Sequence, residues 1–128
     1  MMSRSGVGRA PGTPYLSIDG AKMQRNILKM AEMAQRSGVA LRPHVKTHKI
    51  PAIARKQIEA GAVGITVAKI SEAEVMADGG ILDIFVAYPL VTEETIRQAI
   101  ALREREGFRW QPVRKITSWR SGWRLTLA

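Results

Sequence analysis

The chain contains no cysteine, and this absence excludes a whole group of chemistries. Disulfide bonds, thiolate nucleophiles and thiolate metal sites cannot form within these 128 residues. Histidine is almost as scarce, because only His44 and His48 are present. The missing thiols constrain the cellular compartment only weakly.

A long apolar run is also missing. No stretch approaches the ~20 apolar residues that span a bilayer, and the segment from Met1 to Pro14 is too polar for a signal peptide. The composition, with 45% hydrophobic and 24% charged residues, is typical of a soluble globular protein. We therefore expect a cytoplasmic protein that does not bind a membrane.

Acidic residues are outnumbered, which raises the question of a nucleic-acid partner. The net charge is +9, but residues 1–102 hold 13 Lys and Arg against 9 Asp and Glu, whereas residues 103–128 hold 7 against 2. The basic charge is thus concentrated at the C-terminal end, where no defined nucleic-acid recognition module is visible. Nucleic acid is therefore a less favoured partner than a small molecule.

Helical and strand patterns alternate along the chain. Apolar runs predict strands at residues 15–18, 39–46, 64–68 and 83–87. Helical spacing and end signals predict helices at about residues 19–38, 51–60, 71–79 and 92–107. Asp19 and Thr92 are expected N-caps, Pro51 suits a first helical turn, and Ser71 with Glu74 forms the pattern of a capping box.

This alternation predicts an α/β fold with a parallel sheet covered by helices. Strand starts about 20 to 25 residues apart favour a TIM-type (β/α)8 barrel. The chain has about half the ~250 residues of such a barrel, so we expect only its N-terminal three to four β-α units. The predicted organisation is a disordered lead-in at 1–13, the partial barrel at 14–108 and a basic tryptophan-rich tail at 109–128.

The octapeptide at residues 42–49 (Arg-Pro-His-Val-Lys-Thr-His-Lys) is the most informative segment. With strand periodicity, Arg42, His44, Lys46 and His48 share one face. A solvated edge strand is one interpretation. The other is a barrel strand that ends in a Schiff-base lysine, since functional groups of barrels gather at the C-terminal ends of strands. The successive β-α units favour the second interpretation.

The sequence resembles the N-terminal third of D-threonine aldolase and D-serine dehydratase-like enzymes, which have the alanine racemase-like fold of pyridoxal-phosphate enzymes. The resemblance covers roughly Thr13 to Phe108. The octapeptide makes it specific at family level, although it does not separate aldolase from dehydratase. The segments that carry it are residues 13–16, 18–19, 25–27, 41–49, 61–66 and 72–75.

This resemblance implies that Lys46 forms a Schiff base with pyridoxal 5′-phosphate in a lyase acting on D-3-hydroxy amino acids. His44 is expected either beside the cofactor or in a structural hydrogen bond. Thr66 either faces the cofactor ring or packs in the barrel. His48 either joins the site or caps a helix, while Arg42 either holds a carboxylate or braces the barrel. Lys49 is expected to be solvated.

The sequence also departs from the family pattern. The remaining barrel strands, the phosphate-binding loop and the C-terminal domain with its divalent-metal site have no counterpart here, and no His-x-Asp or His-x-Cys pair is present. We therefore expect no metal ligands, weak or no activity for this chain alone, and exposed apolar surface that favours a homodimer.

Two other functions remain open from the sequence. One is a non-catalytic pyridoxal-phosphate carrier, although the related cofactor-homeostasis proteins lack the octapeptide. The other is nucleic-acid binding through the tail, where all three tryptophans lie. A frameshift or truncation, a fused basic segment and a divergent strand with alternating Trp123, Leu125 and Leu127 are the three explanations for that tail.

Overall fold

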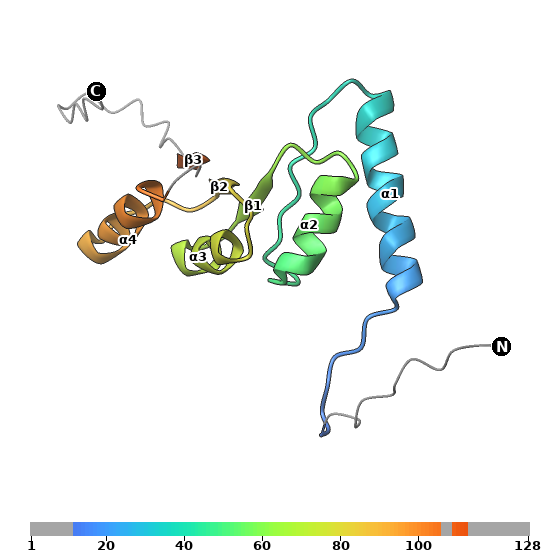
Figure 1. Cartoon of the computed structure of the whole chain (residues 1–128), viewed down its shortest axis with the longest axis horizontal. Helices are drawn as coiled ribbons and strands as arrows, with labels where there is room; N and C mark the ends of the chain where they lie inside the picture. The colour runs from blue at the N-terminus through green and yellow to red at the C-terminus, as the bar shows by residue number, and fades with distance from the viewer. Residues whose placement is uncertain (1–11, 106–108, 113–128) are drawn as a thin grey trace.

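The computed structural model describes residues 12–105 and 109–112, in which two helices are followed by alternating strands and helices (Figure 1). In chain order the elements are α1 (Gly20–Arg36), α2 (Pro51–Glu59), β1 (Ile65–Val67), α3 (Ile70–Asp78), β2 (Asp83–Val86), α4 (Glu93–Arg103) and β3 (Arg109–Pro112). Helix α1 packs on α2 at one end of the molecule, and α3 packs on both β1 and β2. The predicted α/β class is confirmed.

Within the described residues, the three strands form one sheet in the order β1-β2-β3, and neighbouring strands run parallel. Ile65 of β1 is paired with Ile84 of β2, which is in turn paired with Trp110 of β3. Helices α3 and α4 make the two crossovers that connect parallel neighbours. The predicted parallel sheet with helical connections is therefore confirmed.

Strand β3 lies in the segment that the sequence assigns to the basic tail. Its pairing with β2 extends from Asp83–Arg109 to Val86–Pro112, so the β-α alternation continues past residue 108. The predicted strand around Trp123 lies outside the described residues, as does most of the predicted lead-in. The domain boundaries themselves stay a prediction.

The core lies between the sheet and the helices that cross over it. All three residues of β1 are buried, and β2 buries Ile84 and Val86 while its other residues are half-buried. This pattern is typical of parallel strands that are covered on both faces. The buried cluster consists of Val45, Ala54, Ile65, Val67, Ile70, Ala73, Met76, Ala77, Ile81, Ile84, Val86, Ala99 and Leu102.

Local sequence signals locate three of the four helix starts. The Asp19 carboxylate accepts a hydrogen bond from the Lys22 N–H at 2.9 Å, so Asp19 is the N-cap of α1. The Thr92 hydroxyl accepts from the Thr95 N–H at 3.2 Å in the same way at α4. Pro51 is the first residue of α2. These three predictions are confirmed.

The predicted capping box at Ser71 and Glu74 is wrong. Helix α3 begins at Ile70 after Lys69, and no side chain caps Lys69 or the first turn in the predicted way. Instead the carboxylate of Glu72 turns back and accepts a hydrogen bond from the Ala68 N–H at 2.9 Å. The acidic residue that faces the helix start is thus two positions earlier than the pattern predicts.

Two predicted strands are not regular strands. Residues 15–18 pair with no strand in the described part of the chain. The predicted strand at 39–46 forms a single parallel bridge, His44 to Thr66, next to β1. The next bridge toward the N-terminus would need an N–H at position 43, and Pro43 has none. Residues 41–45 are therefore an extended segment that follows β1 without a continuous ladder.

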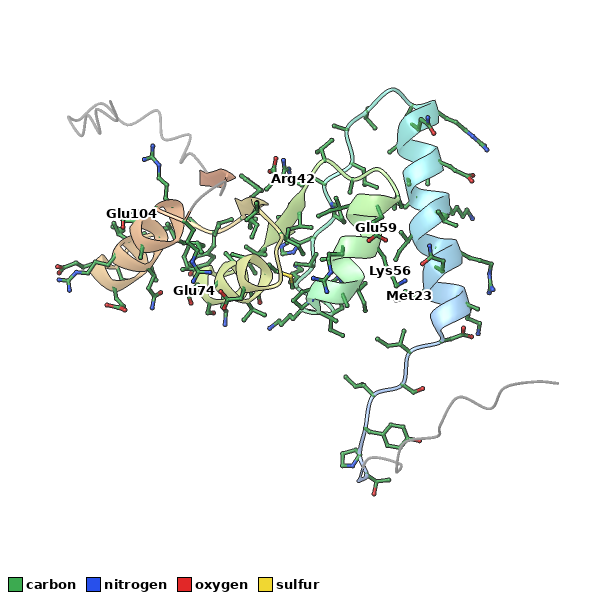
Figure 2. The ribbon with its side chains drawn as sticks, viewed as in Figure 1. Met23, Arg42, Lys56, Glu59, Glu74 and Glu104 are labelled. Atoms are coloured by element: carbon green, nitrogen blue, oxygen red, sulfur yellow. The ribbon has the colours of Figure 1, made fainter. Side chains whose placement is uncertain are left out.

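Arg42 ties the beginnings of the extended segment and both neighbouring strands together (Figure 2). Its Nη1 lies 2.7 Å from Asp83 Oδ1 and donates to the backbone oxygens of Ile65 and Asp83, each at 3.3 Å. Both side chains of the ion pair are largely buried, with 22% and 27% exposed. Arg42 therefore holds a carboxylate and braces the sheet at the same time.

No helix in the described part of the chain is long and apolar enough to cross a membrane.

We predict that Gly64→Ala destabilises the fold by about 2 kcal/mol, because the added methyl group overpacks the Arg42 site. A Cβ at Gly64 would lie 2.6 Å from Asp83 O and would also overlap the Arg42 guanidinium. Urea unfolding measures the effect. Gly20→Ala is the matched control, since its Cβ would meet no atom within 4 Å. Equal stability of the two variants would contradict this role of Arg42.

Candidate functional site

The candidate site lies where the extended segment ends. The Val45 N–H donates to Thr66 O at 2.8 Å, and the Thr66 N–H donates to Pro43 O at 2.8 Å. Val45 O then accepts from the N–H groups of His48 and Lys49, which closes a turn over residues 46–48. Lys46 is therefore the first residue after the segment that pairs with β1. Because this segment runs parallel to β1, Lys46 follows its C-terminal end.

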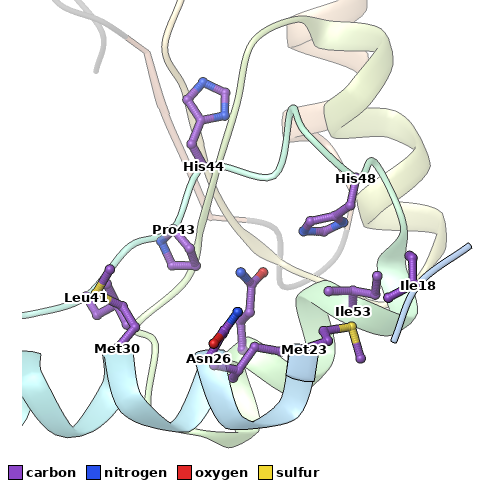
Figure 3. Close-up of a pocket in the computed structure, with 11 residues that line it drawn as sticks. Ile18, Met23, Asn26, Met30, Leu41, Pro43, His44, His48 and Ile53 are labelled. Carbon is purple, nitrogen blue, oxygen red and sulfur yellow. The ribbon is translucent and has the colours of Figure 1, made fainter. Parts of the chain in front are cut away.

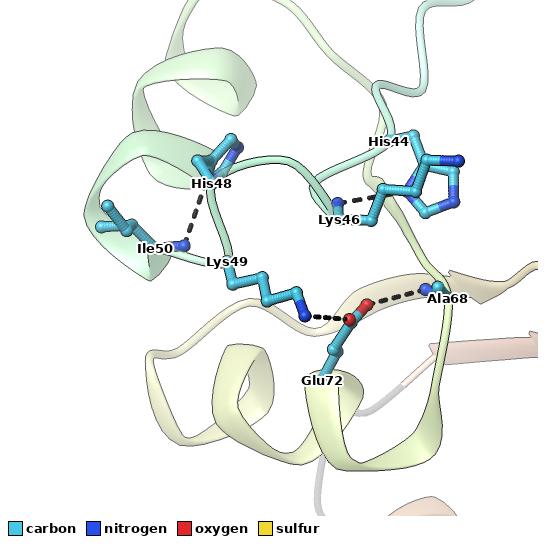
Figure 4. Close-up of polar contacts among 7 residues, drawn as sticks. All are labelled: His44, Lys46, His48, Lys49, Ile50, Ala68 and Glu72. Carbon is cyan, nitrogen blue, oxygen red and sulfur yellow. Dashed lines mark hydrogen bonds and ion pairs between the residues drawn. The ribbon is translucent and has the colours of Figure 1, made fainter. Parts of the chain in front are cut away.

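The turn breaks the predicted common face. Val45 is fully buried opposite His44 and Lys46, as period two requires. Period two would also place Thr47 on the Val45 side, yet Thr47 is exposed because the extended backbone has already ended. Arg42 reaches the strand starts and His48 turns toward α2, so the structure leaves only His44 and Lys46 next to each other (Figure 4).

His44 accepts a hydrogen bond from the backbone N–H of Lys46 through Nδ1, at 3.2 Å. Of the two roles expected for His44, the structure contains the structural hydrogen bond. Its place beside a cofactor stays a prediction. Burial lowers the pKa of His44 below its usual value, and the charge of Lys46 lowers it further, while Glu72 opposes the shift. The neutral imidazole is therefore the favoured form at neutral pH.

His48 makes a local hydrogen bond just before α2, whereas α2 itself has no side-chain cap, so neither of its two expected roles is established. Its Nδ1 accepts from the backbone N–H of Ile50, the residue that precedes α2, at 3.0 Å. Among the residues that the structure describes, neither His48 Nε2 nor Gln57 Oε1 has a hydrogen-bond partner, and both atoms are buried. Burial lowers the pKa of His48, and contacts with Gln57 and Ile50 only partly oppose this shift.

A cavity of about 550 Å³ separates α1 from the extended segment and α2 (Figure 3). His44 and His48 lie on one wall, and Met23, Asn26 and Met30 of α1 point toward it from the other. Lys46 does not line this cavity. The two histidines thus border an apolar space that Lys46 does not line.

Glu72 is the functional candidate that the sequence reading missed. Its side chain is 9% exposed, and its carboxylate accepts from the Ala68 N–H and forms an ion pair with Lys49 Nζ at 3.2 Å. Lys49 was expected to be solvated, and 59% of its side chain is exposed, but this ion pair fixes its end (Figure 4). A glutamate at the third position of a helix that begins at Ile70 was the available signal.

The pKa of Glu72 reflects opposing influences. Burial raises it, but the hydrogen bond from Ala68 and the ion pair with Lys49 outweigh the burial, and His44 adds to them. The pKa lies below its usual value as a result. Glu72 is therefore ionised at neutral pH.

Thr66 is a packed strand residue. It lies in the middle of β1, is 8% exposed, and has both backbone groups bonded to the extended segment. This environment matches the packed barrel threonine that was one of its two expected roles. Its contact with a cofactor stays a prediction.

The amine of Lys46 suits a reaction with a molecule that carries an aldehyde group. The Lys46 side chain is exposed, and its amine forms no ion pair with the residues that the structure describes. An accessible amine with this freedom can condense with a carbonyl carbon. Within residues 12–105 and 109–112, no group of three His, Cys, Asp or Glu side chains lies close enough to hold a metal ion.

The chain is similar to known enzymes over most of its described length. The model of the alanine racemase N-terminal domain matches residues 18–107. D-threo-3-hydroxyaspartate dehydratase of Delftia sp. (strain HT23) is 44% identical over 93 residues, which cover 73% of this chain and 24% of the relative. D-threonine aldolase of Arthrobacter sp. is 44% identical over 79 residues, covering 62% of this chain and 21% of the relative.

A solved structure agrees with these sequence matches. D-threonine aldolase from Filomicrobium marinum superimposes with a TM-score of 0.75 at 40% sequence identity, over 79% of this chain and 27% of that one. The chain thus spans about a quarter of the length of the relatives that it matches.

We predict that His48 makes stability fall as the pH falls through about 6.5, its value in the unfolded chain. Because the folded pKa is lower, the unfolded state binds more protons below that pH, and acid therefore favours unfolding. His48→Asn keeps an acceptor for the Ile50 N–H but does not titrate. Urea unfolding at about pH 7.5 and 5.5 should show a smaller loss for this variant than for the original chain.

His44→Asn is the comparison variant: it removes the contribution of His44, whose pKa is also lowered, and leaves the contribution of His48 in place. The same pH-dependent loss in the original chain and in His48→Asn would contradict the prediction.

Proposed function

Because this chain belongs to the alanine racemase N-terminal domain family, we propose that it binds pyridoxal 5′-phosphate through a Schiff base on Lys46. One observation carries the proposal. Lys46 is the first residue after a segment paired in parallel with β1, and its amine is exposed. The C-terminal ends of parallel strands are where barrel enzymes gather their reactive groups.

Lys46 would hold the aldehyde carbon of the cofactor, and His44 would lie beside it. The backbone N–H of Lys46 donates to His44 Nδ1, which fixes the direction of the imidazole and leaves Nε2 with the proton of the neutral ring. Thr66 lies below this pair in β1, because its backbone bonds the residues on either side of His44. When bound, the cofactor supplies an electron sink for negative charge on the substrate α-carbon.

The proposed substrates are D-3-hydroxy amino acids. The relatives are named for acting on D-threonine and on D-threo-3-hydroxyaspartate, and both compounds carry a hydroxyl group on the β-carbon. An aldolase breaks the Cα–Cβ bond of such a substrate, whereas a dehydratase removes the α-proton and then the hydroxyl group. We propose a lyase of this class for the complete protein, in the cytoplasm, with the D-amino acid as its partner.

We also propose that residues 14–108 supply the N-terminal three to four β-α units of a TIM-type barrel. The extended segment, β1 and β2 are adjacent and parallel, as consecutive barrel strands are. In the relatives, about three quarters of the length lies outside the matched part. The phosphate anchor and the divalent-metal site of the family belong to that remainder in this proposal. The chain by itself should be weakly active, and its open edge favours a homodimer.

We predict that borohydride reduction in the presence of pyridoxal phosphate labels Lys46. The complex should absorb as a protein-bound Schiff base, and peptide mapping should place the label in the turn over residues 46–48. Lys46→Met should lower total labelling about tenfold, because it removes the amine that would form the Schiff base.

Lys56→Met is the control, because Lys56 lies in α2 away from the turn. A folded chain that shows neither the absorbance nor the label at Lys46 would overturn the proposed function.

A further inference from the structure

Two lysines compete for one aldehyde in the candidate site. Lys46 and Lys49 are three residues apart, on either side of the same turn, and more than half of the Lys49 side chain is exposed. Accessibility alone therefore does not decide which amine reacts. The difference between them lies in the partner of each amine.

We propose that Glu72 is a positioning residue that selects Lys46 as the reactive amine by holding Lys49 in an ion pair. This inference rests on the proposed function, because it concerns the same aldehyde. Lys49 Nζ lies 3.2 Å from Glu72 Oε1, whereas Lys46 forms no ion pair with the described residues. An ammonium must leave its ion pair and lose a proton before its nitrogen can attack a carbonyl carbon.

The carboxylate is fixed before it meets Lys49. Its other oxygen accepts the Ala68 N–H at 2.9 Å, and only 9% of the Glu72 side chain is exposed. Glu72 also lies in the first turn of α3, where the helix dipole favours a negative charge. Lys49 therefore faces a charge that is already oriented, and the ion pair orders only the lysine side chain.

The backbone of Lys49 supports the same orientation. Its φ of 54° lies in the left-handed region, which is uncommon for a residue with a side chain. The Lys49 N–H donates to Val45 O at 2.8 Å and closes the turn. Figure 4 shows that the Lys49 side chain points to Glu72, while Lys46 leaves the turn beside His44. The unusual backbone thus directs the second lysine away from the first.

Glu72 also determines where the pairing with β1 stops. Continuing the parallel ladder by one step would require the Ala68 N–H to donate to Val45 O. Glu72 accepts that N–H instead, and Val45 O accepts from the turn. The same carboxylate therefore ends the pairing before Lys46 and forms the ion pair with Lys49.

The test is the distribution of the reduced pyridoxal label between the two lysines. Glu72→Gln keeps an oxygen for the Ala68 N–H and removes the charge that holds Lys49. We expect the ratio of label on Lys49 to label on Lys46 to rise roughly five- to tenfold, as for loss of a partly exposed charge-assisted contact. A residue that only stabilised the fold would not change this ratio in folded protein.

Glu74→Gln is the matched control, because Glu74 lies in the same helix and forms no ion pair among the described residues. It should leave the ratio unchanged. Lys49→Arg keeps the positive charge opposite Glu72 and cannot form the Schiff base, so the double variant Glu72→Gln with Lys49→Arg should return the label to Lys46 alone.

A salt series on the unaltered chain provides a second measurement that does not depend on the folding of the variant. About 1 M NaCl shortens the screening length to about 3 Å, and it should raise the Lys49 share because Lys49 is the exposed end of the pair. A ratio that stays constant both in salt and in folded Glu72→Gln overturns the inference. If label on Lys46 persists in that case, the proposed function stands; absence of any label on Lys46 overturns the proposed function first.

Discussion

The arrangement of the site depends on the hydrogen bond from the backbone N–H of Ala68 to the carboxylate of Glu72. In a continuous parallel ladder this N–H would bond the backbone of Val45, and Lys46 would remain part of a strand. It donates to Glu72 instead. Val45 O is then free to accept from His48 and Lys49, and the chain turns at once. The Glu72 carboxylate of α3 thus ends the pairing with β1 at Val45, and Lys46 lies exposed in the turn that follows.

At the other end of the extended segment, an ion pair holds it where the ladder to β1 does not continue. Pro43 removes the backbone donor that would continue the pairing toward the N-terminus. Arg42 replaces it with contacts to Ile65 and Asp83 at the beginnings of β1 and β2. The extended segment is therefore held by Arg42 near its beginning and by backbone hydrogen bonds at Leu41, Pro43 and Val45. This leaves its register specified although it is not a regular strand.

The helix starts show how far local chemistry reaches. Asp19, Pro51 and Thr92 act on backbone groups within three residues, so their roles follow from the sequence alone. The capping box at Ser71 follows the same local rule and fails. The carboxylate of Glu72 makes a contact with Ala68 and another with Lys49, and the second depends on where a distant turn lies. A local sequence pattern cannot predict the ion pair with Lys49, because it depends on how separate elements pack.

The sequence by itself determined the α/β class and the parallel order of the β-α units, and the family resemblance singled out Lys46 as the expected Schiff-base lysine. These follow from periodicity, from short-range caps and from a contiguous octapeptide. The tertiary structure decided which partners the polar residues of that octapeptide contact. Arg42 contacts Asp83, which lies 41 positions away in the sequence, and Lys49 forms an ion pair with Glu72. His48 accepts a hydrogen bond from Ile50, just before α2. Such partners are chosen by the packing of separate elements, because a buried or half-buried charge must find its counter-charge wherever the fold places one.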